Sequence, residues 1–359
     1  MSERHEWSAG ETDVLARAVV RAPSVHNTQP WSLELADGQA ALYERADLAL
    51  PFHDPLGRDR SISCGAAVEH LELGMHVLGV ATDLRLLPEP GDPAVVARLL
   101  VAGSRVPTDV DLHRYSAIAR RRSYRHRFAA TAVSGYARKD LLAAASFEGV
   151  TVKPLHGNAE FAALADVLEY AGVAARADRG YQRELALWTI RDESTHEHGV
   201  GIAGSALPAS TLPWAGIVRA RTSVPDRQTL AERLAGETVL VFGTAGDTRI
   251  DHIRVGMAME RTWLAAVDMG LVAAVQTQPL HLSEVRASLA TSLGLPGRPQ
   301  LLMRVGHAAG PVPQSPRRRE AELLRPPPGN GNGTSGDNGN HRRAGGDSGA
   351  PAARAAPRR

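Results

Sequence analysis

One short connector, RAPSVHNTQPW at residues 21–31, holds more hydrogen-bonding groups than a turn between two elements needs. The side-chain amides of Asn27 and Gln29 can each donate and accept, and Trp31 adds a flat apolar surface. Two interpretations are open: the connector contacts a ligand, or it stabilises a turn before a strand. His26 within it is typical of a hydrogen-bonded loop histidine rather than of an acid catalyst.

Two basic segments have the chemistry of an anion site. RRRSYRHRF at 120–128 follows a helical pattern, and SPRRRE at 315–320 precedes a low-complexity tail. Guanidinium groups and a hydroxyl suit phosphate, whereas most basic runs are solvated surfaces. The position of Ser123 among the arginines favours the phosphate interpretation for RRRSYRHRF. For SPRRRE both interpretations stay open. Arg304 is interpreted as a structural residue that pairs with a carboxylate.

The other reactive residue types favour structural interpretations. Cys64 is the single cysteine, so it cannot form an internal disulfide, and its apolar helical surroundings predict a small core residue. The motif HEH at 196–198 lacks a zinc spacing, and GTAGD at 243–247 lacks the glycines and the lysine of a phosphate loop. We therefore predict no metal site.

Composition limits the class of protein. The 359 residues are 43% apolar and 4% aromatic, so alanine, leucine and valine must fill most of a sizeable core. The net charge is +2, with much of the excess in 326–359, which predicts no nucleic-acid surface. The polar N-terminal stretch and the lack of a long apolar run predict no secretion signal and no membrane span. The expectation is a cytoplasmic protein.

A first cycle of elements is expected over residues 12–108. Thr12 is expected to cap its first helix, and Pro23 follows the end of that helix. Alternation around Asp37-Gly38 predicts a hairpin. The expected elements are a helix at 12–21, a hairpin at 31–44, a helix at 61–79 and strands at 83–88 and 95–103.

A second cycle is expected over residues 109–325, and the two cycles hint at an internal duplication. Residues 192–228 are rich in Gly, Pro and Ser, and a loop of this length usually covers or gates a site. The Gly-, Pro- and Asn-rich residues 326–359 are predicted to be disordered. The expected helices are 109–120, 138–148, 158–176, 251–269 and 283–293, and the expected strands are 150–155, 237–244, 271–279 and 299–308.

APSVHNTQPW resembles the APSxxNxQPW segment of the FMN-dependent nitroreductase superfamily, which lies against the isoalloxazine and ribityl part of the flavin. RRSYR at 121–125 resembles the family's Arg-x-Ser-x-Arg/Lys element, which grips the flavin phosphate and ring edge. The resemblance implies these flavin contacts: Ser24, Asn27, Gln29, Pro30, Trp31, Ser32 and Leu33 in the first segment, and Arg121, Ser123 and Arg125 in the second.

Two further segments extend the resemblance. PQLLMRVGHAAGPVPQSPRRREAELL is similar to the family's ending, which implies that Arg317 and Arg318 join the phosphate site. GLVAAVQTQPL sits where the family places a turn whose backbone N–H groups face flavin N5, N1 and O2, which implies Gln276, Thr277 and Gln278. With SISCGAAVEHLELG and DHIRVGMAMERTWLAAVDMG, the chain is most similar to the Acg-type single-chain branch.

The resemblance implies an α+β fold: a mixed, mainly antiparallel sheet flanked by helices, in two similar halves. In homodimeric relatives the two flavin-contacting segments come from different subunits, whereas this chain holds both. The expectation is a pseudo-dimer, either a monomer or a further homodimer. Its parts are one half at 1–108, a second half at 109–325 with a lid-like loop at 192–228, and the disordered tail at 326–359.

The activity that the resemblance implies is transfer of hydride from NAD(P)H through the N5 atom of bound FMN to a nitroaromatic or quinone-like acceptor. The cofactor carries the chemistry, so no catalytic side chain is expected. An alternative is a flavin-sequestering protein, with a lid over the FMN and little turnover. A third possibility is a redox-neutral or flavin-cleaving enzyme.

Overall fold

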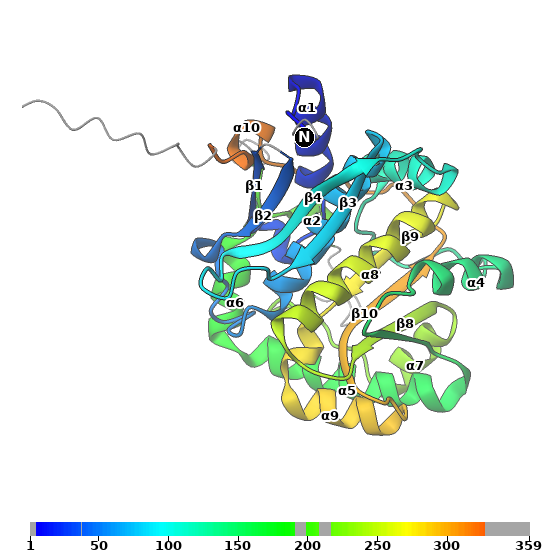
Figure 1. The fold of residues 1–359 in the computed structure, drawn as a ribbon. Coiled ribbons are helices and arrows are strands. Elements are labelled where there is room, and N and C mark those ends of the chain that lie inside the picture. The colour runs from blue at the N-terminus through cyan, green and yellow to red at the C-terminus, as the bar shows by residue number, and fades with distance from the viewer. Residues whose placement is uncertain (1–4, 37, 191–198, 208–216, 327–359) are drawn as a thin grey trace, which may run out of the picture. The chain divides into compact units, whose positions relative to one another are not determined.

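The computed structural model describes residues 5–36, 38–190, 199–207 and 217–326. Residues 1–327 group into one compact unit, in which helices and antiparallel sheets are mixed (Figure 1). The fold class is therefore α+β, as expected. Among the described residues, no helix has the length and apolarity needed to span a membrane. The tail predicted to be disordered lies, apart from Pro326, outside the described residues.

The first sheet has the strand order β1-β2-β4-β3, and every neighbouring pair is antiparallel. The hairpin turn between β1 and β2 contains Gly38, whose φ of 72° is a left-handed value that glycine adopts without strain. The elements are α1 (Ala9–Val20), η1 (Val25–Asn27), β1 (Trp31–Ala36), β2 (Gln39–Glu44), η2 (Ala46–Leu48), α2 (Arg58–Val77), β3 (Val80–Leu86) and β4 (Val95–Ser104).

The second sheet has the order β5-β8-β10-β9 and is also antiparallel throughout. Its elements are α3 (Asp109–Arg120), α4 (Gly135–Ala144), β5 (Val150–Pro154), α5 (Gly157–Ala177), α6 (Arg179–Leu187), β6 (Thr189–Ile190), β7 (Ile202–Ala203), η4 (Gly204–Ala206), α7 (Arg227–Ala235), β8 (Thr238–Thr244), α8 (Arg249–Asp268), β9 (Val272–Gln276), η6 (Gln278–His281), α9 (Ser283–Ser292), β10 (Arg298–Gly306) and α10 (Glu320–Leu323).

The second sheet repeats the connectivity of the first. Replacing β1, β2, β3 and β4 by β5, β8, β9 and β10 converts one strand order into the other. The long helices α2 and α8 occupy the same place in each cycle, between the second and third strands. The described helices α5, α6 and α7 follow β5, where the first cycle has only a hairpin turn. The division into two halves near residue 108 remains a prediction.

Helices α2 and α8 cross with reciprocal contacts. Gly65 and Gly256 meet at the crossing, where a Cβ on Gly65 would lie 2.1 Å from the carbonyl oxygen of Ile253. A Cβ on Gly256 would lie 2.0 Å from the carbonyl oxygen of Ile62. Each glycine thus faces the residue three positions before the other, a pattern that a two-fold axis produces.

Polar pairs one turn further along repeat this reciprocity. His70 on α2 contacts Glu260 on α8 at 2.7 Å, and Arg261 on α8 donates to Glu69 on α2 at 2.6 Å. Glu69 and His70 stand in α2 at the positions that Glu260 and Arg261 occupy in α8. The pairs therefore exchange places when the two helices are exchanged, as residues of an isologous interface do.

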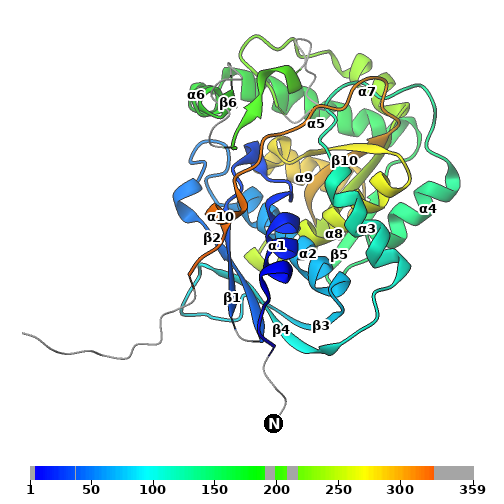
Figure 2. The ribbon, with the colours of Figure 1, turned by 90° about the horizontal axis from the view of Figure 1, so that it is seen from above.

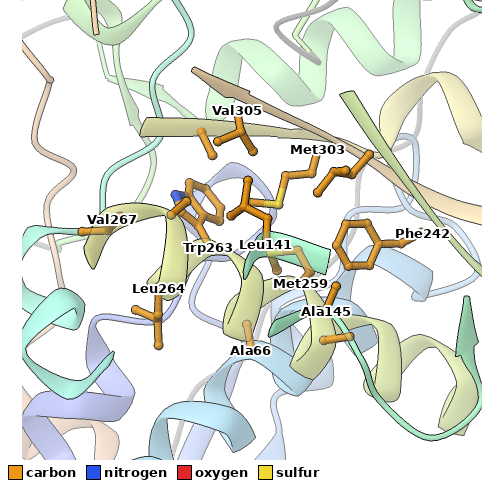
Figure 3. Packing of buried hydrophobic residues seen from close by; sticks show 14 of the residues in the cluster. Ala66, Leu141, Ala145, Phe242, Met259, Trp263, Leu264, Val267, Met303 and Val305 are labelled. Carbon is orange, nitrogen blue, oxygen red and sulfur yellow. The ribbon is translucent and has the colours of Figure 1, made fainter. Parts of the chain in front are cut away.

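Strand alternation places the second sheet between two apolar layers. Leu240 and Phe242 of β8 pack toward α8, whereas Val239 and Val241 of the same strand pack toward α5, α7 and α9. Figure 3 shows the first of these layers, in which Trp263 of α8 lies close to Met303 and Val305 of β10.

The C-terminal segment returns from the second sheet to the first (Figure 2). It ends in a parallel bridge between Leu324 and Leu33 of β1, and the backbone N–H of Arg325 donates to Leu33 O at 2.8 Å. This path carries the basic residues 317–319 past the connector at 21–31.

Several local expectations were wrong. Ser8, not Thr12, caps α1, because Ser8 and Glu11 form a capping box that starts the helix at Ala9. Helices α6 and α7 were missed, since both are short and flanked by polar residues. The two four-stranded sheets are antiparallel, in line with the expected α+β fold, and among the described strands only β6 and β7 pair in parallel.

Candidate functional site

The connector after α1 is held in an unusual backbone conformation. His26, Asn27 and Gln29 have φ values of 46°, 56° and 50°, in the left-handed region that non-glycine residues seldom adopt. The hydroxyl of Ser24 accepts from Gln29 N at 2.9 Å, and Val25 N donates to the hydroxyl of Ser63 on α2 at 3.0 Å. Strain of this kind persists only where surrounding contacts enforce it, and it often marks a functional site.

The amide of Asn27 joins the connector to two remote segments. Its Nδ2 donates to Gly201 O at 3.1 Å and to Pro316 O at 2.9 Å, while its Oδ1 accepts from Arg317 at 2.8 Å. The connector therefore meets both the C-terminal basic segment and part of the 192–228 loop.

The amide of Gln29 makes a parallel set of contacts. Its Nε2 donates to Gly199 O at 2.7 Å, and its Oε1 accepts from Arg318 N at 3.1 Å. Both Asn27 and Gln29 are buried, and protein groups satisfy their amides in this structure. The prediction that they contact flavin is not tested by these contacts.

A narrow slot of about 90 Å³ lies beside the connector. One wall is the connector itself, and the opposite wall comes from the end of β9 and from the segment after α3. The slot therefore joins three of the four sequence segments singled out above. Its lining residues are Pro23, Ser24, Val25, His26, His53, Ser123, Arg125, Ile217, Trp263, Ala274, Val275 and Thr277.

The segment after α3 is fixed by the second sheet. Ser123 forms a parallel bridge with Ala273 of β9, and Tyr124 N donates to Ala273 O at 2.9 Å. This pairing directs Ser123 and Arg125 to the slot. Arg125 has few anionic neighbours, and burial together with the charge of Arg121 lowers the pKa of its guanidinium to about 10.

Arg121 is buried against helix α8. Its Nε lies 3.3 Å from Glu260 Oε1, its Nη2 donates to Arg21 O at 3.1 Å, and its guanidinium stacks 4.6 Å from the centre of the Trp263 ring. Its Nη1 has no hydrogen-bond partner. The structure thus holds Arg121 by a core carboxylate, and it does not line the slot.

A second cavity of about 300 Å³ is lined by the C-terminal basic segment and by Arg21 and Arg122. Burial and then the charges of Arg121, Arg122 and Arg21 lower the pKa of Arg317 to about 9. Like charges are gathered here, Glu320 is the one carboxylate in the cavity's lining, and Arg318 Nε is buried with no hydrogen-bond partner. Such a cluster is expected to bind an anion, because an anion would relieve the repulsion.

A buried carboxylate lies behind the slot. Asp59 Oδ2 accepts from His53 Nε2 at 3.2 Å, from His281 Nε2 at 3.0 Å and from the hydroxyl of Thr277, and Arg58 lies 3.1 Å from Oδ1. The charges of His281 and Arg58 hold the pKa of Asp59 well below its usual range although burial opposes them.

The ligand atoms of His53, Asp59 and His281 lie within 4.8 Å of one another, close enough for a metal ion. All three hydrogen bonds end at Oδ2 of Asp59, whereas its Oδ1 lies 3.1 Å from Arg58 and has no hydrogen-bond partner. The absence of a metal therefore stays a prediction.

Other predicted contacts lie away from the slot. Trp31 and Leu33 are in the core under the first sheet, Ser32 pairs with Tyr43 in the hairpin, and Pro30 O accepts from Arg45 N. Gln276 is buried at the end of β9, and Gln278 is buried in η6 with no partner for its Oε1. Their assignment as flavin contacts stays a prediction.

Several slot residues carry no signal that the sequence reveals. His53 and Asp59 stand in PFHDPLGRD, where six residues separate them, and Trp263 is read as a core position of α8. Ile217 follows residues 208–216, which lie outside the described residues. These side chains gather only because α2, α8 and β9 converge.

Comparison with known proteins identifies the family. The model of the nitroreductase family matches residues 118–307, which span the second sheet and the basic segment after α3.

The chain belongs to the nitroreductase family.

Curated relatives cover nearly the whole of this nitroreductase-family chain. It is 31% identical over 311 residues to the "Putative NAD(P)H nitroreductase Rv3131" of Mycobacterium tuberculosis, which covers 85% of this chain and 88% of the relative. It is 28% identical over 324 residues to the "Putative NAD(P)H nitroreductase acg" of the same organism. This match covers 87% of this chain and 96% of the relative.

Solved structures of the family are more distant. The FMN-dependent nitroreductase NfnB from Mycobacterium smegmatis, in complex with NADPH, is 18% identical with a TM-score of 0.36, covering 60% of this chain and 99% of that one. A nitroreductase from Bacteroides fragilis with bound FMN is 16% identical with a TM-score of 0.34, covering 58% of this chain and 93% of that one.

Proposed function

We propose that this nitroreductase-family protein binds one FMN per chain and transfers hydride from NAD(P)H to a flat nitroaromatic or quinone-like acceptor. The observation that carries the proposal is the meeting of the connector, Arg125 and the end of β9 around one slot, beside a buried cluster of arginines. FMN and NADPH are named with solved members of the family, which supports the choice of cofactor and donor.

The donor set fits the anionic end of FMN. Positive neighbours outweigh negative ones around Arg317 and Arg125, and Arg318 Nε is a buried donor without a partner. A phosphate dianion would accept from these groups and offset their repulsion. The slot proposed for the isoalloxazine ring is tighter. Its volume of about 90 Å³ admits a tricyclic ring only if side chains such as His26 and Ile217 move apart.

When bound, FMN supplies a hydride acceptor and donor at N5. The chain's own groups would bind and orient it. The hydroxyl of Ser123, the guanidinium of Arg125 and the backbone at Val275 and Thr277 all line the slot. Fixed positive charge and N–H groups at the slot favour an anionic form of a reduced ligand, because they are oriented before the reaction. Trp263 and Ile217 exclude water from its apolar face.

A second candidate is sequestration of FMN without turnover, and one observation favours it. Asn27 and Gln29 hold the described residues 199 and 201 of the 192–228 loop against the connector, and Ile217 of the same loop lines the slot. A loop fixed in this way would restrict the approach of a nicotinamide ring. The loop then decides whether the same binding residues serve an enzyme or a flavin store.

We also propose that the chain is a fused pseudo-dimer whose halves share one flavin. The repeated strand order and the reciprocal contacts of α2 and α8 support this arrangement. The chain would then function as a monomer or form a further homodimer. The buried single thiol of Cys64 suits a reducing cytoplasm.

Anaerobic mixing of the purified holoprotein with NADPH and with NADH tests the proposed function. Bleaching of the flavin bands, followed by recovery on adding a quinone, is the result expected of an enzyme. Flavin that stays oxidised with both nucleotides but bleaches with dithionite would support sequestration. The oligomeric state is read from light scattering during size-exclusion chromatography.

A further inference from the structure

His53 and Asp59 form a buried pair behind the slot. His53 is 4% exposed and Asp59 is 2% exposed. His53 Nε2 lies 3.2 Å from Asp59 Oδ2, whereas His53 Nδ1 is buried and has no hydrogen-bond partner. Because Asp59 engages one ring nitrogen, Nδ1 is the ring atom left to face a ligand in the slot that His53 lines.

The backbone of His53 is fixed from the other side. Glu184 of α6 accepts from His53 N at 2.7 Å and from Phe52 N at 3.1 Å. The His53 ring lies 4.3 Å from the ring of His26 and stacks at 5.5 Å on the ring of Tyr181. A side chain held by its backbone, its neighbours and one nitrogen is preorganised for chemistry at the other nitrogen.

His281 contacts the same carboxylate but faces elsewhere. Its Nε2 lies 3.0 Å from Asp59 Oδ2, yet it lines a different cavity of about 490 Å³, together with Arg58 and Arg286. His281 does not line the slot. The two histidines therefore share a carboxylate, but only His53 has access to a ligand in the slot.

The charged and titratable groups around His53 are of both signs. Besides Asp59 they are His26, His281, Arg58, Asp54, Tyr181, Glu184 and Arg125. Burial, and then the charge of His53, hold the pKa of His26 well below its usual range. His26 Nε2 has no hydrogen-bond partner, so His53, whose ring contacts Asp59, is the histidine of the slot that a carboxylate positions.

We propose that His53 is the general acid that protonates the acceptor during its reduction, with Asp59 as the residue that positions it and stabilises its imidazolium. The inference rests on the proposed function. It adds a catalytic side chain to that function, whereas the sequence analysis predicted no catalytic side chain. Reduction of a quinone to its hydroquinone takes up one hydride and one further proton. The hydride, with both electrons, comes from the nicotinamide donor by way of the bound cofactor.

His53 supplies the proton. The Nδ1–H bond breaks with its electron pair kept on the ring, and an O–H bond forms at the acceptor oxygen. A proton from water then restores the imidazolium. Positioned acids of this kind contribute on the order of 10²- to 10⁴-fold to a rate.

The kinetic test compares His53→Gln with His113→Gln, a control at a surface histidine that pairs with Asp268. Each holoprotein is reduced with dithionite, and its reoxidation by a benzoquinone is followed in one turnover, in H₂O and in D₂O. We expect His53→Gln to be slower by a factor of about 100, with a changed solvent isotope effect, while His113→Gln stays within about 3-fold of the wild type. Equal rates for the two variants would overturn the inference.

The outcomes separate this inference from the proposed function. A wild-type protein that is not reoxidised by any quinone overturns both. A wild type that is reoxidised at a rate that His53→Gln does not change overturns the inference alone. The flavin content and the thermal stability of each variant show whether a slow rate reflects loss of cofactor or loss of fold. A slow His53→Gln variant that keeps its full flavin content supports the role of His53 as the general acid.

A second readout needs no turnover. Nitrogen-15 NMR of histidine-labelled protein shows which ring nitrogens carry protons. We expect the wild type to hold a proton on His53 Nε2, and we expect Asp59→Asn to lose this preference for Nε2. Metal analysis of the same samples is included, since a stoichiometric metal that Asp59→Asn loses would assign the cluster to metal binding and overturn the acid role.

Discussion

Gly65 of α2 and Gly256 of α8 face each other at the crossing of the two longest helices that join the sheets. Each glycine allows the other helix to approach until backbone meets backbone, and each points to the carbonyl three residues before its counterpart. Helix α8 carries Trp263, which lines the slot, and α2 carries Asp59, which contacts the slot residue His53. The crossing therefore joins two helices that each carry a residue of the site.

Substitution of Gly256 by alanine is predicted to be severely destabilising. The new Cβ would lie 2.0 Å from Ile62 O, and backbone cannot move away as a flexible side chain does. We expect a loss of several kcal/mol in the free energy of unfolding, on the scale of overpacked cores, ~3 kcal/mol. Urea unfolding measures it. Gly10→Ala in α1 is the control, because nothing lies within 4 Å of its Cβ, and equal stability of the two variants would contradict the close crossing.

Removal of a single arginine from the proposed phosphate site is predicted to weaken FMN binding. Arg125→Ala and Arg317→Ala each remove a cation that has few carboxylate neighbours, so an anion loses charge-assisted hydrogen bonds worth about 1.5–3 kcal/mol, or roughly 10- to 100-fold in Kd. Fluorescence titration of the apoprotein with FMN gives the constants. Arg17→Ala, whose side chain pairs with Asp13 on the surface, should bind as the wild type does.

Inorganic phosphate is predicted to stabilise the apoprotein. The like charges of Arg121, Arg122 and Arg317 oppose folding, and a bound anion offsets them, so Tm should rise with phosphate concentration at fixed ionic strength. The rise should shrink in Arg317→Ala. A Tm that responds equally to phosphate and to chloride in both proteins would show that only screening is at work.

Stability is predicted to fall as pH rises through the neutral range, because of Glu69. Burial raises its pKa from 4.5 to about 7, so the folded state holds a proton that the unfolded state has lost. The stabilisation is complete below pH 4.5 and disappears by about pH 7, a change of at most about 3 kcal/mol. Unfolding at a series of pH values should show a smaller fall for Glu69→Gln than for the wild type. Glu148→Gln, on the surface, should leave the pH profile unchanged.

Deletion of residues 326–359 is predicted to leave folding and flavin content unchanged. The last described backbone contact is Arg325 N to Leu33 O, which the deletion keeps. Circular dichroism and absorbance compare the two forms. Loss of flavin on this deletion would contradict the prediction of a disordered tail.

The sequence predicted the regular elements where apolar periodicity was strong. The α2 and α8 helices, the β1–β2 hairpin and the final strand β10 lie within a few residues of their expected ranges. Helix starts were less certain, because Ser8 and Thr12 both have the chemistry of a cap and only Ser8 has a glutamate three residues later. Short helices such as α6 and α7 lack a long enough pattern to stand out.

The site was only partly predictable for a different reason. The connector, Ser123, Arg125 and Arg317 have residue types that suit a ligand, and the structure brings them near one slot. Trp31 has the right type as well, yet β1 turns its ring into the core. His53 and Asp59 could not be found from the sequence, because their role depends on a tertiary contact with His281, more than 200 residues away.

The most direct test is the amount of FMN in the purified full-length protein. Absorbance of the flavin released on denaturation, divided by the protein concentration, should approach one FMN per chain, either as isolated or after the apoprotein is incubated with FMN. A folded, monodisperse protein that contains no flavin and takes up none would contradict the proposal that the two halves of this chain enclose one flavin.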